Sequence, residues 1–140
     1  MRIAAFPAGE LQTNCYVVSS DTESDCIIID PGQNAFLKIK RIVDENQLHP
    51  LAVFLTHGHA DHTWNAPEVA SAFGIPVFAA KPDHFMVIDP LAGVGPLLAS
   101  MFHSILGNHL LICGTILLQP LITLICPSEF FHFLDILRGE

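Results

Sequence analysis

Basic side chains are scarce in this sequence of 140 residues, which has six Lys and Arg against fourteen Asp and Glu and a formal net charge of −8. A chain with this balance of charge repels phosphate backbones and anionic membrane surfaces. We therefore expect no nucleic acid partner. The length is that of one domain with a core of its own.

Cysteine pairs and targeting signals are also lacking. The four cysteines are widely separated and form no CxxC pair, so we predict neither a disulfide framework nor a thiolate zinc site. They are Cys15, Cys26, Cys113 and Cys126. We expect reduced, mostly buried thiols at these positions. The apolar run after Met1 is broken by Pro7 and Gly9, so we expect no signal peptide. We therefore predict a cytoplasmic protein.

Charged residues are absent from Pro90 to Ser128, where Leu, Ile, Cys and Thr become frequent. The most apolar part, Leu110 to Cys126, has 17 residues and is interrupted by Gly114, Gln119 and Pro120. A membrane-spanning helix needs ~20 apolar residues, so a membrane anchor is not favoured. Two other interpretations stay open, namely strands packed on both faces, or a tail never selected to complete a fold. We predict a first portion over residues 1–100 and an atypical apolar tail over 101–140, as a truncated or frame-shifted gene would produce.

In the first portion, short apolar runs alternate with turns rich in Pro, Gly, Asn and Asp, a pattern typical of an α/β protein. The predicted strands span residues 2–6, 14–19, 26–30, 51–55 and 75–79. Apolar residues at helical spacing predict an amphipathic helix that starts near Asn34. A second helix is predicted between Asn65, as its N-cap, and Gly74, as its C-terminal stop.

Three imidazoles and a carboxylate occur within six positions, directly after the predicted strand 51–55. They are His57, His59, Asp61 and His62. These side chains offer the nitrogen and oxygen ligands that zinc and similar divalent metals accept. In an extended segment His57 and His59 point the same way, and Gly58 between them leaves room for close approach. The alternative is a polar loop whose histidines cap the next helix or face solvent, but such a density of ligand types favours a metal site.

The segment Thr56 to His62 reads THGHADH and matches the HxHxDH signature, so the chain resembles the metallo-β-lactamase superfamily. The segments Thr13–Tyr16 and Ile27–Gly32 resemble the N-terminal strands of its glyoxalase II-like branch. The resemblance covers residues 1 to about 100 and implies the N-terminal half of an αββα sandwich. It also implies that His57 and His59 bind a first metal ion, and that Asp61 and His62 bind a second.

By this resemblance the chain would be a zinc-dependent hydrolase of thioesters such as hydroxyacylglutathione, or of another small ester or amide, with iron or manganese as alternative metals. Two cations can lower the pKa of a bound water to about 7, and the resulting hydroxide attacks the substrate carbonyl. Asp61 is expected to orient that hydroxide. Asp30 is a hypothetical acceptor for the ring N–H of a ligand histidine, and capping of its own Asp-Pro-Gly turn is the equal alternative.

Members of this family supply further ligands from a later Gly-His turn and Gly-Asp step, and this sequence contains neither. The tail offers only His103, His109, His132 and Asp135, in unfamiliar surroundings. Half of a site weakens metal affinity and geometry. Two functions therefore stay open, a hydrolase whose site is completed by the tail or by a second chain, and a non-catalytic remnant. An uncovered β-layer would also leave an exposed apolar face and promote self-association.

Five further side chains bear on the question of a substrate pocket. For Phe54, Trp64 and Phe73, core packing is the better interpretation than a substrate wall. His84 and Asp89 are candidates for the rim of a pocket, with solvated loop positions as the alternative.

Overall fold

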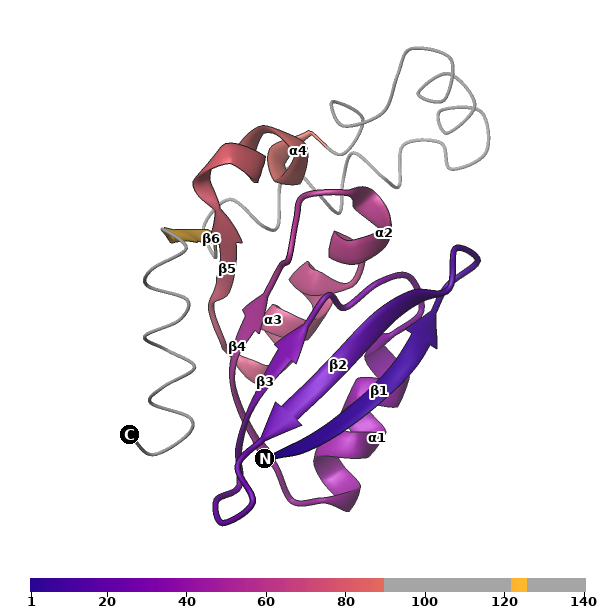
Figure 1. Cartoon of the computed structure of the whole chain (residues 1–140), viewed down its shortest axis with the longest axis vertical. Coiled ribbons are helices and arrows are strands. Elements are labelled where there is room, and N and C mark those ends of the chain that lie inside the picture. The colour runs from indigo at the N-terminus through magenta and orange to yellow at the C-terminus, as the bar shows by residue number, and fades with distance from the viewer. Residues whose placement is uncertain (90–121, 126–140) are drawn as a thin grey trace.

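The computed structural model describes residues 1–89 and 122–125, which form a six-stranded sheet with helices against one face (Figure 1). The strands, in their order across the sheet, are β1 (Arg2–Ala8), β2 (Thr13–Ser19), β3 (Asp25–Ile29), β4 (His49–Phe54), β5 (Val77–Ala80) and β6 (Ile122–Ile125). The helices are α1 (Phe36–Glu45), α2 (Ala60–Thr63), α3 (Ala66–Phe73) and α4 (His84–Ile88), with a 3₁₀ turn at Lys81–Asp83. The mixed α/β class predicted from the sequence is confirmed.

The direction of the strands decides which segments meet. Strand β2 runs antiparallel to both β1 and β3, whereas β3, β4, β5 and β6 are parallel. The carboxyl ends of β3, β4 and β5 therefore lie at the same edge of the sheet as the beginning of β2. Loops at this edge are the usual location of a ligand site in an open α/β sheet.

The predicted elements agree with the observed ones to within two residues at each strand end. Asn65 is the N-cap residue of α3, and Gly74 ends that helix with a φ of 67°. Helices α2 and α4 were not predicted, because each is too short to show a helical repeat. In the predicted tail, β6 pairs in parallel with β5, and the other residues of 101–140 lie outside the described ranges, so the division of the chain near residue 100 stays a prediction.

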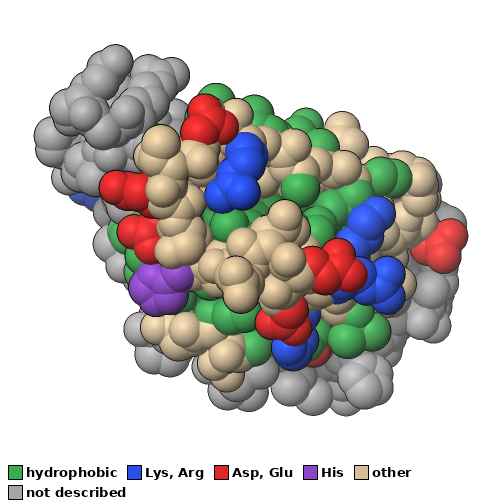
Figure 2. All heavy atoms as spheres, turned by 90° about the horizontal axis from the view of Figure 1, so that it is seen from below, with side chains coloured by type: hydrophobic (Ala, Val, Ile, Leu, Met, Phe, Trp, Pro, Cys, Tyr) green, Lys and Arg blue, Asp and Glu red, His purple; other side chains and the backbone are tan. Residues whose placement is uncertain are grey.

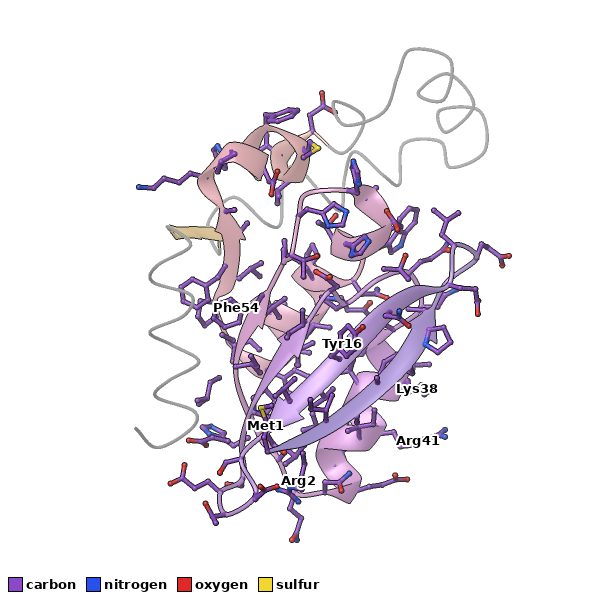
Figure 3. All side chains as sticks on the ribbon, in the orientation of Figure 1. Met1, Arg2, Tyr16, Lys38, Arg41 and Phe54 are labelled. Atoms are coloured by element: carbon purple, nitrogen blue, oxygen red, sulfur yellow. The ribbon has the colours of Figure 1, made fainter. Side chains whose placement is uncertain are left out.

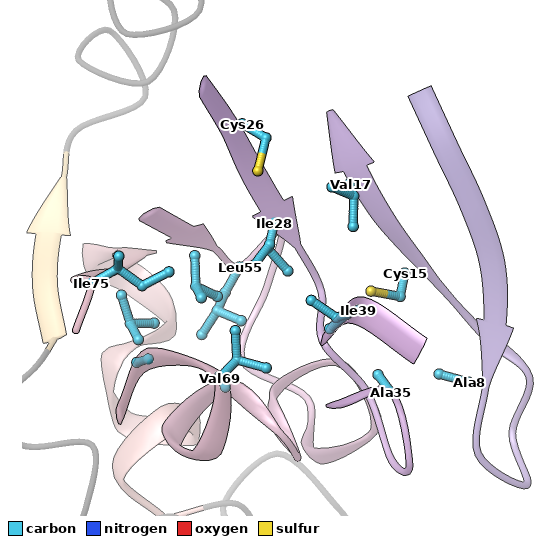
Figure 4. Close-up of a cluster of buried hydrophobic side chains, with 14 of the residues drawn as sticks. Ala8, Cys15, Val17, Cys26, Ile28, Ala35, Ile39, Leu55, Val69 and Ile75 are labelled. Atoms are coloured by element: carbon cyan, nitrogen blue, oxygen red, sulfur yellow. The ribbon is translucent and has the colours of Figure 1, made fainter. Parts of the chain in front are cut away.

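The core lies between the sheet and helices α1 and α3. Side chains alternate along each strand, so that Cys15, Val17 and Ile28 point toward the helices and meet Ile39 of α1 and Val69 of α3 (Figure 4). Phe73 packs against the same cluster, which confirms its assignment to the core. The amphipathic pattern of α1 is thus explained by a buried face of Ile39 and Val43.

The opposite face of the sheet carries a second apolar cluster, formed by Val18, Ile27, Ala52 and Phe54. All four residues are at most 8% exposed, and Tyr16 and Phe54, labelled in Figure 3, both belong to this face. Phe54 stacks on Phe78 with ring centroids 4.9 Å apart, which confirms core packing for Phe54. The expectation of an exposed apolar face is wrong at these four positions, because their side chains are buried. Self-association stays a prediction.

The surface of the lower end of the molecule mixes both signs of charge (Figure 2). Lys40 pairs with Asp44 along α1, and His49 lies 3.0 Å from Asp25. Lys38 Nζ instead lies 4.5 Å above the ring of Phe6. Within the described ranges, no helix has both the length and the hydropathy of a membrane span.

Candidate metal centre

All the residues predicted to bind metal lie at the edge where β3 and β4 end (Figure 1). His57 and His59 belong to the loop that leaves β4, and Asp61 and His62 belong to the short helix α2 that follows. The rings of His57 and His59 are nearly perpendicular, with centroids 4.6 Å apart, and the ring centroids of His57 and His62 are 4.0 Å apart. Folding therefore brings the three imidazoles together, as the sequence predicted.

Asp30 organises this loop from the end of β3. It is only 2% exposed, and its φ of 49° turns the chain sharply after the strand. Its carboxylate accepts hydrogen bonds from the Thr56 backbone N–H at 2.8 Å and the Thr56 hydroxyl at 2.6 Å, and lies 2.9 Å from His62 Nδ1. The side chain of Asp30 thus reaches a histidine of the motif, as hypothesised, and the turn Asp30–Gly32 is closed by backbone atoms instead.

These contacts also assign the tautomers of two histidines. An ionised carboxylate can only accept, so the hydrogen between Asp30 and His62 is on His62 Nδ1. The Thr56 hydroxyl donates its single hydrogen to Asp30. It can therefore only accept a hydrogen bond from His57 Nδ1, which is 3.0 Å away. In the neutral form each of these rings then has a free lone pair on Nε2, which is the form in which imidazole binds a metal.

The electrostatic environment favours neutral imidazole at His57. Burial lowers the pKa of His57, and the neighbouring His62 and His59 lower it further, against an opposing effect of Asp30 and Asp61. A neutral ring is the form required of a ligand, because a protonated nitrogen has no lone pair to give.

Asp61 is held by a residue distant in the sequence. The hydroxyl of Thr13, at the beginning of β2, donates to Asp61 Oδ2 at 2.6 Å. The same oxygen lies 3.4 Å from His62 Nε2. Two ligands about 2.1 Å from a tetrahedral ion are themselves about 3.4 Å apart, so this pair of acceptor atoms fits one divalent ion.

Two glycines allow the chain segments around the motif to approach closely. A Cβ at Gly32 would lie 2.4 Å from the carbonyl oxygen of Asp61. A Cβ at Gly58 would lie 2.8 Å from both the carbonyl oxygen of Asp83 and Cβ of Met86. The neighbour of Gly58 is thus the segment that begins α4, whereas the close approach to a metal ion expected at Gly58 stays a prediction.

The side chains of His57, His59, Asp61 and His62 are suitable metal ligands, but their ligand atoms do not converge on a single metal position. Across residues 1–89, no three His, Cys, Asp or Glu side chains are arranged so that they could hold one ion together. The rings of His57, His59 and His62 adjoin, and Asp61 Oδ2 lies 3.4 Å from His62 Nε2, so side-chain rotations would be needed to gather a third ligand around one ion.

The remaining candidates fall into two groups. His84 is the first residue of α4 and Asp89 directly follows that helix, whose residues Met86 and Val87 adjoin Gly58, so both stay candidates for a pocket rim. Trp64 is half-buried at the end of α2. The tail candidates lie outside the described ranges and are His103, His109, His132 and Asp135.

Sequence reasoning missed the two threonines that hold the acidic residues. Thr56 directly precedes the motif, so its place beside His57 was a signal that could have been used. Thr13 had no such signal, since its partner Asp61 is 48 positions away.

Comparison with known proteins matches residues 8–121 to the family model described as the metallo-beta-lactamase superfamily. An uncharacterized protein of Mycobacterium leprae is 50% identical over 101 residues, which cover 72% of this chain and 46% of that protein. Hydroxyacylglutathione hydrolase GloC of Haemophilus influenzae is 36% identical over 87 residues, which cover 61% of this chain and 40% of that one. The chain thus spans less than half the length of these two relatives.

Two solved structures are similar to the chain. The crystal structure of BLEG-1 B3 metallo-beta-lactamase gives a TM-score of 0.58 at 37% identity and covers 64% of this chain and 42% of that one. The crystal structure of TTHA1623 in a di-iron-bound form gives a TM-score of 0.57 at 28% identity, with 64% and 44% covered.

Proposed function

We propose, because this chain belongs to the metallo-β-lactamase superfamily, that it carries the first half of a metal-dependent hydrolase site. In this proposal His57 and His59 bind one divalent ion, and Asp61 and His62 bind a second. Zinc suits imidazole and carboxylate ligands, and iron or manganese would accept them too. The di-iron form of one structural neighbour supports iron as an alternative.

The observation that carries the proposal is the connection of Asp30 to two histidines. Its carboxylate lies directly beside His62 Nδ1, and through the Thr56 hydroxyl it sets the tautomer of His57. A buried carboxylate that holds histidines with Nε2 free is the usual outer support of a histidine–metal site. A loop that served only as a helix cap would not need this arrangement.

The proposed substrates are small thioesters of the hydroxyacylglutathione type, or related small esters. The support is the name of the Haemophilus relative, together with the Thr13–Tyr16 and Ile27–Gly32 segments. When bound, the metal ions would lower the pKa of water and polarise the substrate carbonyl. Asp61 would orient the attacking water, since its Oδ2 is already held by Thr13 and faces His62.

A metal-binding chain without turnover is the second candidate. Its support is the absence from the sequence of any later Gly-His turn and of any Gly-Asp step, the motifs that would supply the remaining ligands. Catalytic zinc normally has three protein ligands and a water, so a smaller set binds metal more weakly than a complete one.

Elemental analysis of the purified chain tests the proposal, with turnover of a hydroxyacylglutathione thioester as a second readout. We expect roughly two equivalents of zinc or iron, lost in His59→Ala. His49→Ala is the matched control, because His49 is exposed and, among the residues that the structure describes, its side chain pairs with Asp25, away from the site. Metal without turnover selects the second candidate, and less than about half an equivalent in the unmutated chain contradicts both.

A further inference from the structure

We infer that Thr13 is a positioning residue for Asp61, an inference that rests on the proposed metal site. The contact joins the beginning of β2 to helix α2, 48 residues later in the chain. Its length of 2.6 Å is typical of a hydroxyl that donates to a carboxylate, one of the stronger classes of hydrogen bond in proteins.

The location of Thr13 follows from the pleat of the sheet. Thr13, Cys15 and Val17 alternate onto the helix side of β2, and Thr13 is only 7% exposed. Because β2 is antiparallel to β3, its first residue lies beside the loops that leave β3 and β4. A hydroxyl at this position thus reaches Asp61, whereas the next inward residue along β2 is Cys15, in the apolar core.

The backbone on both sides of the contact is held independently. On one side, the connection between β1 and β2 is closed by a Gln12-to-Gly9 hydrogen bond, and Gln33 Oε1 accepts from the Glu10 N–H. On the other side, Gly32 lets its loop lie against the backbone of Asp61. The Thr13 hydroxyl is therefore presented to Asp61 by a supported frame, not by a free loop end.

The chemical consequence concerns which oxygen of Asp61 is oriented. Thr13 donates to Oδ2, the oxygen that lies 3.4 Å from His62 Nε2, and so holds it at the distance that suits one ion. The Asp61 side chain is about one quarter exposed, at 28%, and without this bond it would be free to rotate toward solvent. Thr13 thereby prepares the Asp61–His62 pair before any metal arrives.

The test is Co²⁺ binding by calorimetry, together with the absorption spectrum of the bound ion, in four proteins. Thr13→Val removes the hydroxyl and keeps the shape, and we expect Co²⁺ to bind about 10- to 100-fold more weakly, with an altered spectrum. Thr13→Ser keeps the hydroxyl and should restore both readouts. Thr63→Val is the matched control, because Thr63 is also buried in this region, and within residues 1–89 its hydroxyl makes a single contact, of 3.5 Å with the carbonyl of Ala60.

Unchanged affinity and spectrum in Thr13→Val, or an equal loss in Thr63→Val, would overturn the inference. If Thr13→Val does not fold, Thr13→Ala takes its place, since it removes the hydroxyl without adding a methyl group. If the unmutated chain binds no Co²⁺, the proposed function fails, and a double-mutant cycle of Thr13→Val with Asp61→Ala decides the contact. A coupling of roughly tenfold in the unfolding equilibrium would uphold the Thr13–Asp61 bond, and no coupling would overturn it.

Discussion

The buried side chain of Asp30 orients the loop that follows β4. Its carboxylate meets two groups of Thr56 and one ring nitrogen of His62, all at the end of the next parallel strand. The turn residue of one strand thus orients the loop of its neighbour. A left-handed φ of 49° is tolerated here because Asp, like Asn, adopts this conformation more readily than other residues.

Asp30→Asn is predicted to separate the role of the charge from that of the shape. The amide suits the same backbone conformation, but it weakens the bonds from Thr56 and favours the other tautomer of His62 by donating to Nδ1. We expect a loss of about 1–3 kcal/mol in the free energy of unfolding, measured with urea. Metal affinity should fall about 10- to 100-fold. Asp25→Asn is the control, and a similar change at that partly exposed residue would argue against the explanation.

Cys15 and Cys26 are predicted to be unreactive in the folded chain. Both are fully buried, and burial raises the pKa of each thiol to about 12, with Asp30 adding to the effect at Cys15 and Asp25 at Cys26. Iodoacetamide at pH 8 should label them slowly in the native protein and quickly in urea, as read by mass spectrometry of each peptide. Rapid native labelling of either thiol would contradict the buried location.

The raised thiol pKa values also set the direction of a pH effect. The unfolded chain loses these protons near pH 9, whereas the folded chain holds them to about pH 12. Their contribution to stability is therefore complete below pH 9 and is lost as the pH rises from there toward 12.

At the scale of elements, the loop that links β3 to α1 joins several parts of the site. The carbonyl of Pro31 accepts from the Asn65 N–H, and the Asn65 side chain accepts from the Ala35 N–H. Asn65 therefore binds the start of α1 instead of capping its own helix with its side-chain oxygen, although the sequence placed it correctly before α3.

Gly32→Ala is predicted to disturb this junction. The new Cβ would lie 2.4 Å from the Asp61 carbonyl oxygen, so the loop and α2 must move apart, at a cost of about 1–3 kcal/mol. Gly74→Ala is an informative comparison. Nothing lies within 4 Å of a Cβ there, so its cost of about 1–2 kcal/mol comes from the left-handed backbone alone. Urea unfolding gives both values, and only Gly32→Ala should also weaken metal binding.

At the scale of the whole molecule, the order of strands explains the geometry of the site. Parallel β3 and β4 deliver Asp30 and Thr56 to one edge, and antiparallel β2 brings Thr13 to the same edge. The helices α1 and α3 cover one face, which corresponds to one αβ layer pair of the predicted sandwich. The family match to residues 8–121 agrees with this architecture.

The sequence by itself determined the strands β1 to β5, the helices α1 and α3 and the four candidate ligands, because these depend on local signals. Alternation of apolar residues, the Asn65 and Gly74 boundaries and the density of His57, His59, Asp61 and His62 can all be read within a few positions. The tertiary structure alone decided that Thr13 holds Asp61 and that Asp30 reaches His62 instead of its own turn. Those partners are 48 and 32 residues apart, and only strand pairing, which no local pattern encodes, brings them within hydrogen-bond distance.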